Sequence, residues 1–184
     1  MDLEKEERLL RAAQKSKGGP NLPFGELYKA YSPRIKGYLL SRLNDQTLAD
    51  DLVSKTFEKA LDGLDSFRWQ GVPFSAWLFR IARNALIDHI RSEKSSRKVR
   101  LDETAPTKSD LPTQFEELVE SEEDSLLKKA LTQIPKREQE IVYLKFYEGL
   151  TNREIARIKG ISETNVGTIL YRTIQKLREK LTED

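Results

Sequence analysis

Apolar residues recur at steps of three and four along most of this chain, the spacing that lines one face of an α-helix. The clearest example runs from Phe74 to Arg91. Its apolar face consists of Trp77, Leu78, Ile81, Ala82, Ala85 and Leu86. Its other face is polar and mostly basic, with Arg80, Asn84, Ile87, Asp88 and Arg91 near one line. The pattern predicts an amphipathic helix, and it leaves open whether the outer face is merely solvated or binds a partner.

Two further helices are predicted at the start of the chain. Residues 2–14 form a short helix that ends at the Gly-Gly-Pro sequence of residues 18–20, and we assign this helix no function. A second helical pattern covers residues 24–43. Because proline removes one backbone hydrogen bond, we expect a kink or a break at Pro33.

The next helix is predicted to begin at a Thr47-x-x-Asp50 capping pattern. Its buried stripe consists of Leu48, Leu52, Val53, Phe57, Ala60, Leu61 and Leu64. Its outward face carries Asp50, Asp51, Ser54, Lys55 and Glu58. Taken alone, these outward residues are solubilising charges that contribute little to stability.

Residues 65–75 are predicted to form a loop that contains Phe67, Trp69, Gly71 and Pro73. Aromatic residues in such loops commonly pack back onto their own domain. A loop beside a basic helical face also offers what single-stranded DNA needs, namely stacking surfaces next to cations. Stacking of a base on an aromatic ring contributes about 1–3 kcal/mol.

The carboxyl-terminal part begins with two predicted helices, residues 126–134 and 140–147, separated by Pro135 and stopped at Glu148-Gly149. A capping box, Thr151-x-x-Glu154, then starts a short helix that ends at a tight turn at Gly160. The residues that cap the following helix and face inward along it are Ser162, Val166, Leu170, Ile174 and Leu177. Helix, glycine turn and helix at this spacing are typical of a DNA-binding helix-turn-helix, although purely structural bundles also contain the arrangement.

Charge is distributed unevenly, although the chain's net charge is only +2. Residues 91–100 contain five basic residues and one acidic residue, residues 101–124 contain nine acidic residues and one lysine, and residues 125–184 contain twelve basic and eight acidic residues. Basic blocks around an acidic segment suit two DNA-facing modules joined by a segment that DNA repels. The acidic segment taken alone is a solvated charge run.

Composition excludes several classes of protein. No run approaches the roughly 18–20 apolar residues of a membrane helix, and the acidic start is not a signal peptide, so we predict a cytoplasmic protein without membrane insertion. The chain has no cysteine and a single histidine, His89. We therefore predict no disulfide framework, no metal site and no cofactor.

Two stretches resemble a known family. LADDLVSKTFEKALDGLDSF, the aromatic loop and AWLFRIARNALIDHIR together resemble the second conserved region of bacterial RNA polymerase sigma factors, particularly the extracytoplasmic-function (ECF) group. IPKRE and GLTNREIARIKGIS resemble the fourth conserved region, the domain that binds the -35 element. The chain lacks room for the third domain of housekeeping members. The resemblance implies a transcription initiation factor that is not an enzyme, with three partners: core RNA polymerase (β′ clamp helices and β flap), promoter DNA and an anti-sigma factor.

The resemblance also implies three sets of site residues. The -10 element of the promoter would be held by Phe67, Arg68, Trp69, Gln70, Trp77, Arg80, Arg83, Asn84, Asp88 and Arg91. The -35 element would be read by Thr151, Arg153, Ser162, Glu163, Thr164, Asn165, Thr168, Arg172 and Lys176. Core polymerase would be bound through Asp50, Asp51, Leu52, Val53, Thr56 and Phe57. The family often has basic residues where this chain has Gly167, Thr168 and Ile169, which predicts weaker duplex binding.

The predicted fold is all-α, with two small helical domains joined by a flexible acidic linker. The domains are a leader (1–21), a sigma region 2-like helical bundle (22–95), the linker (96–124) and a sigma region 4-like helix-turn-helix domain (125–184). One alternative is a stand-alone helix-turn-helix regulator, which would dimerise on a palindromic site. Another is a recombinase or nuclease, but the adjacent residues Asp50 and Asp51 diverge on a helix and no other catalytic cluster is evident.

Overall fold

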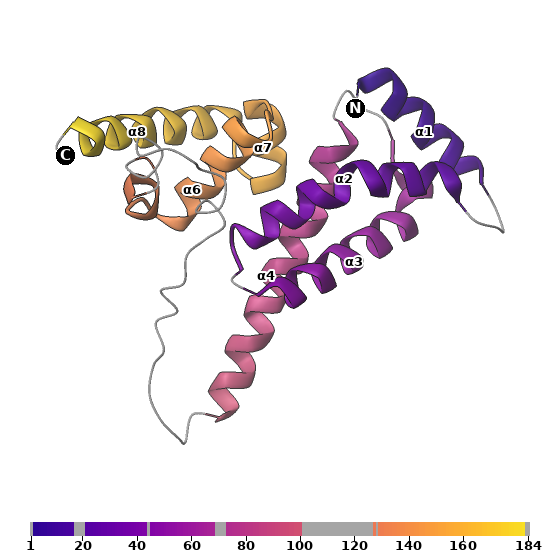
Figure 1. The fold of residues 1–184 in the computed structure, drawn as a ribbon, viewed down its shortest axis with the longest axis horizontal. Helices are drawn as coiled ribbons and strands as arrows, with labels where there is room; N and C mark the ends of the chain where they lie inside the picture. Colours follow the sequence, from indigo (N-terminus) through magenta and orange to yellow (C-terminus); the bar gives the residue numbers. More distant parts are fainter. Residues whose placement is uncertain are drawn as a thin grey trace. The chain divides into compact units, whose positions relative to one another are not determined.

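A computed structural model describes residues 2–16, 21–43, 45–68, 73–100, 127 and 129–182, with only the backbone described for residues 94–100. The chain separates into two compact units, Met1–Thr113 and Gln114–Asp184. Every regular element in these described ranges is helical, which confirms the predicted all-α class (Figure 1). Residues 101–124 of the predicted linker lie outside the described residues.

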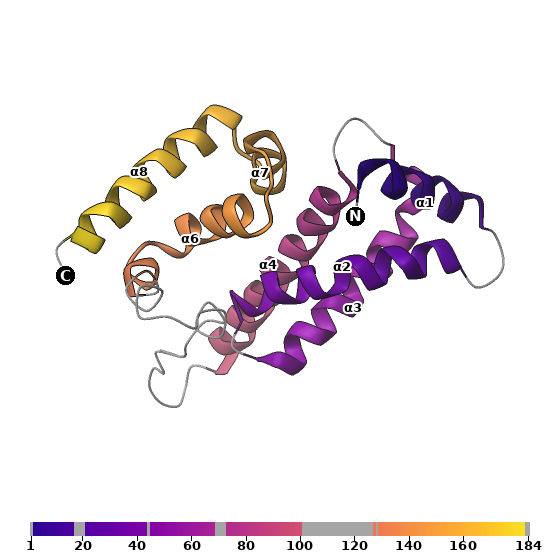
Figure 2. The same cartoon turned by 45° about the horizontal axis from the view of Figure 1, so that its top comes forward.

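The amino-terminal unit is a bundle of helices. Its elements are α1 (Leu3–Lys15), α2 (Leu22–Leu40), α3 (Gln46–Asp62), the 3₁₀ helix η1 (Leu64–Ser66) and α4 (Phe74–Arg100). α2 packs against α1, α3 and α4, and α3 packs along α4, as the second view shows (Figure 2). The fully buried side chains at the centre include Leu27, Ile35, Tyr38, Leu39, Leu52, Phe74, Leu78 and Phe79. The spacing of apolar residues seen in the sequence therefore builds one shared core.

The predicted leader contributes to that core. α1 buries Leu9, Leu10 and Ala13 and packs against α2 and η1. The Asp2 side chain caps this helix by accepting a 2.8 Å hydrogen bond from the Lys5 backbone N–H. At the other end of the unit, α4 continues to Arg100, so residues 96–100 are helical although we predicted them as the start of the linker.

α2 runs through Pro33 without a break. Proline in a helix interior lacks a donor and crowds the preceding turn, which is why the sequence predicted a kink or a break. The neighbouring residues Tyr31 and Ile35 are both buried against the rest of the bundle. Packing on each side of Pro33 therefore holds the two halves in one helix, and local propensity is overridden.

The start of α3 also differs from the prediction. The cap is Asp45 rather than Thr47, and its carboxylate accepts a 3.0 Å hydrogen bond from the Leu48 N–H. Both residues are good helix caps, so the local pattern allowed two starting points. The earlier cap adds two exposed residues, Gln46 and Thr47, to the start of the helix.

The carboxyl-terminal unit consists of a short helical segment at residues 129–132, α6 (Lys136–Val142), the π-helix η3 (Tyr143–Tyr147), α7 (Asn152–Lys159) and α8 (Glu163–Thr182). α8 packs against both α6 and α7. The core of this unit includes Ile141, Leu144, Ile155, Ile158, Val166 and Leu170. The long helix α8 thus has one buried side, which orients its opposite side toward solvent.

The helix predicted over residues 140–147 is an α-helix only up to Val142 and continues as a π-helix. Tyr143 and Tyr147 stack with their ring centroids 4.8 Å apart, and the Tyr143 hydroxyl donates to Glu148 at 3.2 Å. A π-turn has a wider repeat than an α-turn, so it shifts the side-chain register. The shift keeps Tyr143 and Leu144 buried and leaves Phe146 exposed.

Candidate nucleic-acid interface

α4 presents a continuous exposed line of polar side chains. Arg80, Asn84, Asp88 and Arg91 are all exposed, while Leu78, Ala82 and Leu86 on the other side of the helix are buried. Steps of four and three residues keep these polar groups above one another along the helix. The arrangement gives two guanidinium groups, one amide and one carboxylate that can meet a nucleic-acid strand. A further candidate on this helix, Arg83, is half-buried.

An aromatic cluster lies at the start of α4. The Phe67 ring is 5.6 Å from Phe74 and 4.9 Å from Trp77, and Phe74 is 5.4 Å from Trp77, measured between ring centroids. Phe74 is buried, whereas Phe67 and Trp77 are half-buried. The structure therefore brings together two of the predicted -10 residues, Phe67 and Trp77. Trp69 and Gln70 lie outside the described residues.

Arg68 is held by its own loop. Its Nη1 atom donates to the carbonyl oxygens of Asp65 at 2.6 Å and Phe67 at 3.0 Å. The side chain is nevertheless exposed, so its positive charge remains accessible to an anion beside the aromatic cluster. A contact from Arg68 to DNA would compete with these two local hydrogen bonds.

The residues predicted to bind core polymerase divide into two groups. Asp50 and Asp51 are exposed on α3, and Asp50 forms an ion pair with Lys36 at 2.7 Å. The other four are buried in the bundle, namely Leu52, Val53, Thr56 and Phe57. They lie on the stripe that packs against the rest of the unit, so they support the α3 surface from beneath and are not part of it.

The helix-turn-helix has the local chemistry that the sequence predicted. The Thr151 hydroxyl accepts from the Glu154 N–H and the Glu154 carboxylate accepts from the Thr151 N–H, which is the complete capping box. Gly160 ends α7 with a φ of 67°, in the left-handed region that favours glycine. The Ser162 hydroxyl accepts from the Asn165 N–H at 3.2 Å and caps α8. The capping box, the left-handed Gly160 and the Ser162 cap together fix the angle at which α8 leaves the turn.

Every residue predicted to meet the -35 element is exposed. Two lie at the start of α7 and seven at or along α8, namely Thr151, Arg153, Ser162, Glu163, Thr164, Asn165, Thr168, Arg172 and Lys176. Val166 and Leu170 are buried between them along α8. The polar groups at the first turns of α8 are therefore free of the core, as a helix that enters a DNA groove requires.

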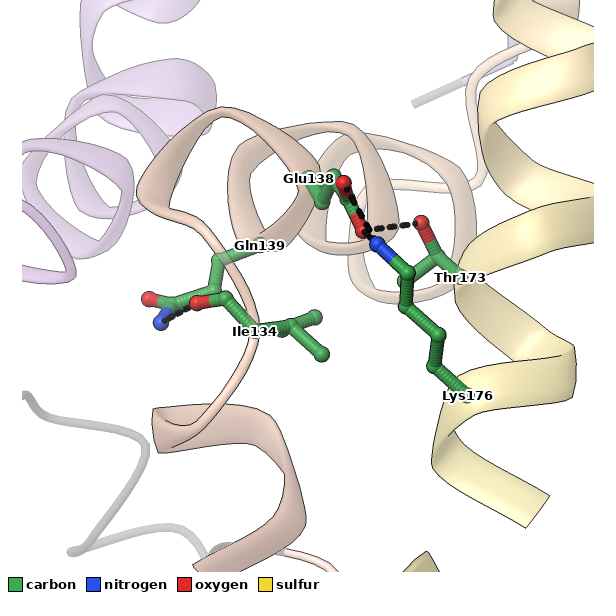
Figure 3. A network of polar contacts seen from close by, with 5 residues as sticks. All are labelled: Ile134, Glu138, Gln139, Thr173 and Lys176. Atoms are coloured by element: carbon green, nitrogen blue, oxygen red, sulfur yellow. Dashed lines mark hydrogen bonds and ion pairs between the residues drawn. The ribbon is translucent and has the colours of Figure 1, made fainter. Parts of the chain in front are cut away.

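Lys176 has an intramolecular partner that the sequence did not indicate. Its ammonium nitrogen lies 3.0 Å from both carboxylate oxygens of Glu138, and the Thr173 hydroxyl donates to the same carboxylate at 3.0 Å (Figure 3). Thr173 is fully buried, so the carboxylate is fixed at the boundary between core and surface. In Figure 3, Gln139 of α6 instead turns back to donate to the Ile134 carbonyl at 2.9 Å.

A second ion pair joins α6 to the end of α7. Lys159 and Glu140 are in contact, and both side chains are almost completely buried. Lys159 therefore belongs to the packing of the module and cannot present its charge to DNA in this arrangement. Breaking such a buried pair by removing one partner leaves an uncompensated charge, which costs about 3–5 kcal/mol.

Sequence reasoning missed two residues of α1 that contact the segments on either side of the loop before α4. The Glu6 carboxylate is buried and the Gln14 amide is half-buried. Burial raises the pKa of Glu6, although a hydrogen bond from Tyr31 acts in the opposite direction. A signal for Glu6 existed, since it shares the three- and four-residue spacing of Leu9, Leu10 and Ala13. A charged residue in an apolar stripe indicates a buried polar contact.

The described residues also bear on two other features, a metal site and a membrane-spanning helix. Within these ranges, no group of three or more His, Asp or Glu side chains is arranged to hold a metal ion. None of the helices in the described part of the chain combines the length and the apolar composition that crossing a membrane requires.

A polar helix face beside an aromatic cluster, together with a helix-turn-helix in a second unit, defines a two-module DNA-binding protein. The Sigma-70 region 2 family matches residues 27–96, and the Sigma-70, region 4 family matches residues 125–177. The ECF RNA polymerase sigma factor BldN of Streptomyces coelicolor is 32% identical over 177 residues, or 96% of this chain and 67% of BldN. The ECF sigma factor SigM of Bacillus subtilis is 30% identical over 158 residues, or 83% of this chain and 91% of SigM. The chain belongs to the ECF family of RNA polymerase sigma factors, which direct the polymerase to specific promoters.

Solved structures agree with this fold. The structure of CnrH in complex with the cytosolic domain of CnrY has a TM-score of 0.67 at 24% identity, covering 98% of this chain and 99% of CnrH. The sigma factor RpoE from Bartonella quintana, in complex with the anti-sigma factor NepR, has a TM-score of 0.66 at 24% identity, covering 88% of this chain and 98% of RpoE. These structures support the fold, and the matches of both conserved regions confirm the predicted family.

Proposed function

We propose that the exposed face of α4 holds the unwound non-template strand of the promoter at the -10 element. The observation that carries this proposal is the line Arg80, Asn84, Asp88 and Arg91, which is exposed along its length and begins beside the aromatic cluster. Guanidinium groups neutralise phosphates, and aromatic rings stack on unpaired bases. Opening DNA costs a few kcal/mol per unstacked base, which contacts of this kind offset.

We propose further that α8 enters the major groove at the -35 element. Glu163, Thr164, Asn165 and Thr168 are exposed on its first turns and would reach base edges. Asn165 suits adenine and Glu163 suits cytosine, while Arg153 and Arg172 suit phosphates. Neither module needs high affinity, because the chain connects them and makes the second contact intramolecular.

The exposed side of α3 is our candidate for docking on the clamp helices of core polymerase, and the β flap is a candidate partner of the carboxyl-terminal unit. Asp50 and Asp51 supply the charge on α3, with Leu52, Val53, Thr56 and Phe57 beneath them. We also propose an anti-sigma factor as a partner, since the sigma factor RpoE is seen in complex with the anti-sigma factor NepR. In this role the chain acts in the cytoplasm, as a specificity subunit and not as an enzyme.

The experiment that tests the -10 assignment uses holoenzyme reconstituted from the full chain and core polymerase. Asn84→Ala and Arg80→Ala are compared with Lys29→Ala, an exposed residue of α2. Permanganate reactivity of unpaired thymines measures promoter opening, and run-off transcription measures its product. We expect each α4 variant to reduce opening about tenfold, the effect of losing one stacking or charged contact. Unchanged opening in both variants would contradict the assignment.

A capture assay separates this function from that of a stand-alone regulator. A regulator of that kind would bind DNA as a dimer and would not engage polymerase. The sigma function predicts that the purified chain binds core polymerase, and that Asp51→Lys on α3 weakens this binding. If the chain shows no affinity for core polymerase and binds a palindromic duplex as a dimer, the proposal is wrong.

A further inference from the structure

Two side chains of α1 reach the segments on either side of the loop that precedes α4. Gln14 contacts the backbone at both ends of η1, and Glu6 contacts the backbone where α4 begins. The aromatic cluster of Phe67, Phe74 and Trp77 is built from these same two segments. α1 is therefore connected to both parts of the cluster by side-chain hydrogen bonds.

The Gln14 contact uses the full donor capacity of its amide. The Nε2 atom donates to the Leu64 carbonyl at 2.9 Å and to the Phe67 carbonyl at 2.9 Å. An amide nitrogen carries two hydrogens, so each carbonyl can receive one of them. The pair of bonds fixes the backbone of Phe67 against α1. These hydrogen bonds add to the packing of α1 against η1.

The Glu6 side chain is more deeply buried than that of Gln14. The residue is 1% exposed, and its Oε1 atom accepts from the Tyr31 hydroxyl at 2.9 Å and from the Ser75 N–H at 3.3 Å. The first N–H groups of a helix have no partner within the helix, so this carboxylate satisfies one of them for α4. A negative group at that end also interacts favourably with the helix dipole. Glu6 thereby joins α1, α2 and the start of α4.

A purely structural role does not require these two residues. Leu9, Leu10 and Ala13 already give α1 a buried apolar side. Burying a carboxylate is unfavourable unless its hydrogen bonds are satisfied, and an apolar residue at position 6 would avoid that cost. Hydrogen bonds are directional, whereas apolar packing is not. Gln14 and Glu6 therefore fix the positions of specific backbone atoms of Phe67 and Ser75.

We propose that Glu6 and Gln14 are positioning residues for recognition of the -10 element, acting through the backbone of Phe67 and Ser75 to hold the aromatic cluster in register with the exposed face of α4. The inference rests on the proposed function of that face. It assigns a role to α1 that the spacing of its residues did not suggest. Neither residue contacts DNA in this proposal.

The test compares Gln14→Ala and Glu6→Ala with two controls on the exposed side of α1, Lys15→Ala and Glu4→Ala. Full-length variants are assembled with core polymerase, and promoter opening is measured on the cognate -10 sequence and on templates substituted at single -10 positions. We expect Gln14→Ala and Glu6→Ala to reduce opening about tenfold and to flatten the preference for the cognate sequence, since misplacement of a recognition group by a fraction of an ångström weakens its contacts. Affinity for core polymerase and for the -35 duplex should stay unchanged.

The conservative variant Glu6→Gln separates geometry from charge. Its Oε1 atom still accepts from Tyr31 and Ser75, so it should restore most of the opening that Glu6→Ala loses. If Glu6→Ala does not fold, Gln14→Ala decides, because that side chain is half-buried and leaves no large cavity. Circular dichroism and thermal unfolding establish that each variant is folded at the assay temperature.

Three outcomes are distinguishable. If Gln14→Ala and a folded Glu6→Ala open all templates as the wild-type protein does, the positioning role is wrong. If they lower core binding, -35 binding and opening in proportion, their role is global stability and the proposal is also wrong. If Asn84→Ala reduces opening while these variants do not, only the present inference fails, whereas a silent Asn84→Ala removes the proposed function itself.

Discussion

Glu138 and Lys176 form a bridge between α6 and α8, in which both carboxylate oxygens lie 3.0 Å from the lysine ammonium. The Lys176 side chain is 46% exposed and that of Glu138 is 21% exposed. The same lysine is a candidate phosphate contact of the -35 reader. A phosphate that approaches Lys176 must therefore compete with a carboxylate of the same protein, which lowers the gain from that contact.

Glu138→Gln should strengthen binding of the holoenzyme to the -35 element. The substitution removes the competing charge, and the retained amide oxygen can still accept a hydrogen bond from Thr173. We expect the slope of log Kd against log salt concentration to steepen by about one unit, the change produced by one additional phosphate contact. Fluorescence anisotropy of a labelled -35 duplex, measured over a salt series, gives both the Kd and the slope of log Kd against log salt concentration.

The matched control for that experiment is Glu179→Gln, which makes the same change of charge at an exposed position of α8. A general increase in positive charge would make both variants bind alike. If the salt slope steepens in Glu138→Gln and not in Glu179→Gln, the additional phosphate contact is assigned to Lys176. Equal slopes for the wild-type protein and Glu138→Gln would show that Lys176 makes no phosphate contact.

Gly160→Ala should destabilise the carboxyl-terminal unit through its backbone. The residue has a φ of 67°, and a Cβ at this position would have no atom within 4 Å, so crowding makes no contribution. A left-handed conformation costs a non-glycine residue about 1–2 kcal/mol. Urea unfolding should show a loss of that size. Gly149→Ala, with a φ of 68° and the same open surroundings, should show a similar loss, and if neither variant is destabilised the left-handed turns are absent in solution.

Glu6 should make folding stability depend on pH in a defined direction. Burial raises the pKa of this carboxyl above its ordinary value. The folded state therefore holds the proton more tightly than the unfolded chain does, and the contribution of Glu6 to stability is fully present below the ordinary pKa. It is lost as the pH rises through the raised pKa.

The measurement is the free energy of unfolding of the wild-type protein minus that of Glu6→Gln, obtained from urea curves between neutral pH and about pH 4. This difference should move in favour of the wild-type protein as the pH falls. Glu4→Gln, at an exposed position of the same helix, corrects for the change in net charge. A difference that moves in favour of the variant on acidification would contradict the burial of Glu6.

The parts of the fold that the sequence predicted best are those governed by neighbouring residues. The capping box at Thr151, the turn at Gly160 and the cap at Ser162 were all predictable because each depends on groups within four residues. Contacts between distant segments left no such local signal. The bridge from Glu138 to Lys176 spans 38 residues, and the bond from Ser75 to Glu6 spans 69.

The same distinction explains two features that the sequence alone left undecided. The local rule for proline predicts a kink or a break at Pro33. The helix is nevertheless unbroken, because Tyr31 and Ile35 are buried on either side of the proline. Leu52 and Phe57 match the family pattern for polymerase binding, and their spacing also places them on the buried stripe. Both are buried in the bundle, and their part in polymerase binding stays a prediction. A sequence pattern identifies the helix that carries a site, whereas the side of the helix depends on what packs against it.

Gly63→Ala should disturb Trp77. A Cβ on Gly63 would lie 3.2 Å from Cζ2 of Trp77 and 3.2 Å from the Lys59 carbonyl oxygen, closer than ordinary van der Waals contact, so the indole and the end of α3 must move by a few tenths of an ångström. The indole has little room, because Phe67 and Phe74 lie 4.9 and 5.4 Å away on the same cluster. We expect a loss of about 1–3 kcal/mol in stability, the usual cost of overpacking a core.

Tryptophan fluorescence can follow this displacement directly. In a Trp69→Phe background, the emission of the single remaining tryptophan, Trp77, reports on the cluster. Gly63→Ala should shift that emission and reduce promoter opening, because Trp77 is a candidate -10 residue. Gly25→Ala in α2 has no atom within 4 Å of its added Cβ, so it should leave the emission unchanged and stabilise the helix slightly. If Gly63→Ala shifts the emission but leaves opening intact, Trp77 supports the fold of the loop and takes no part in holding the DNA strand.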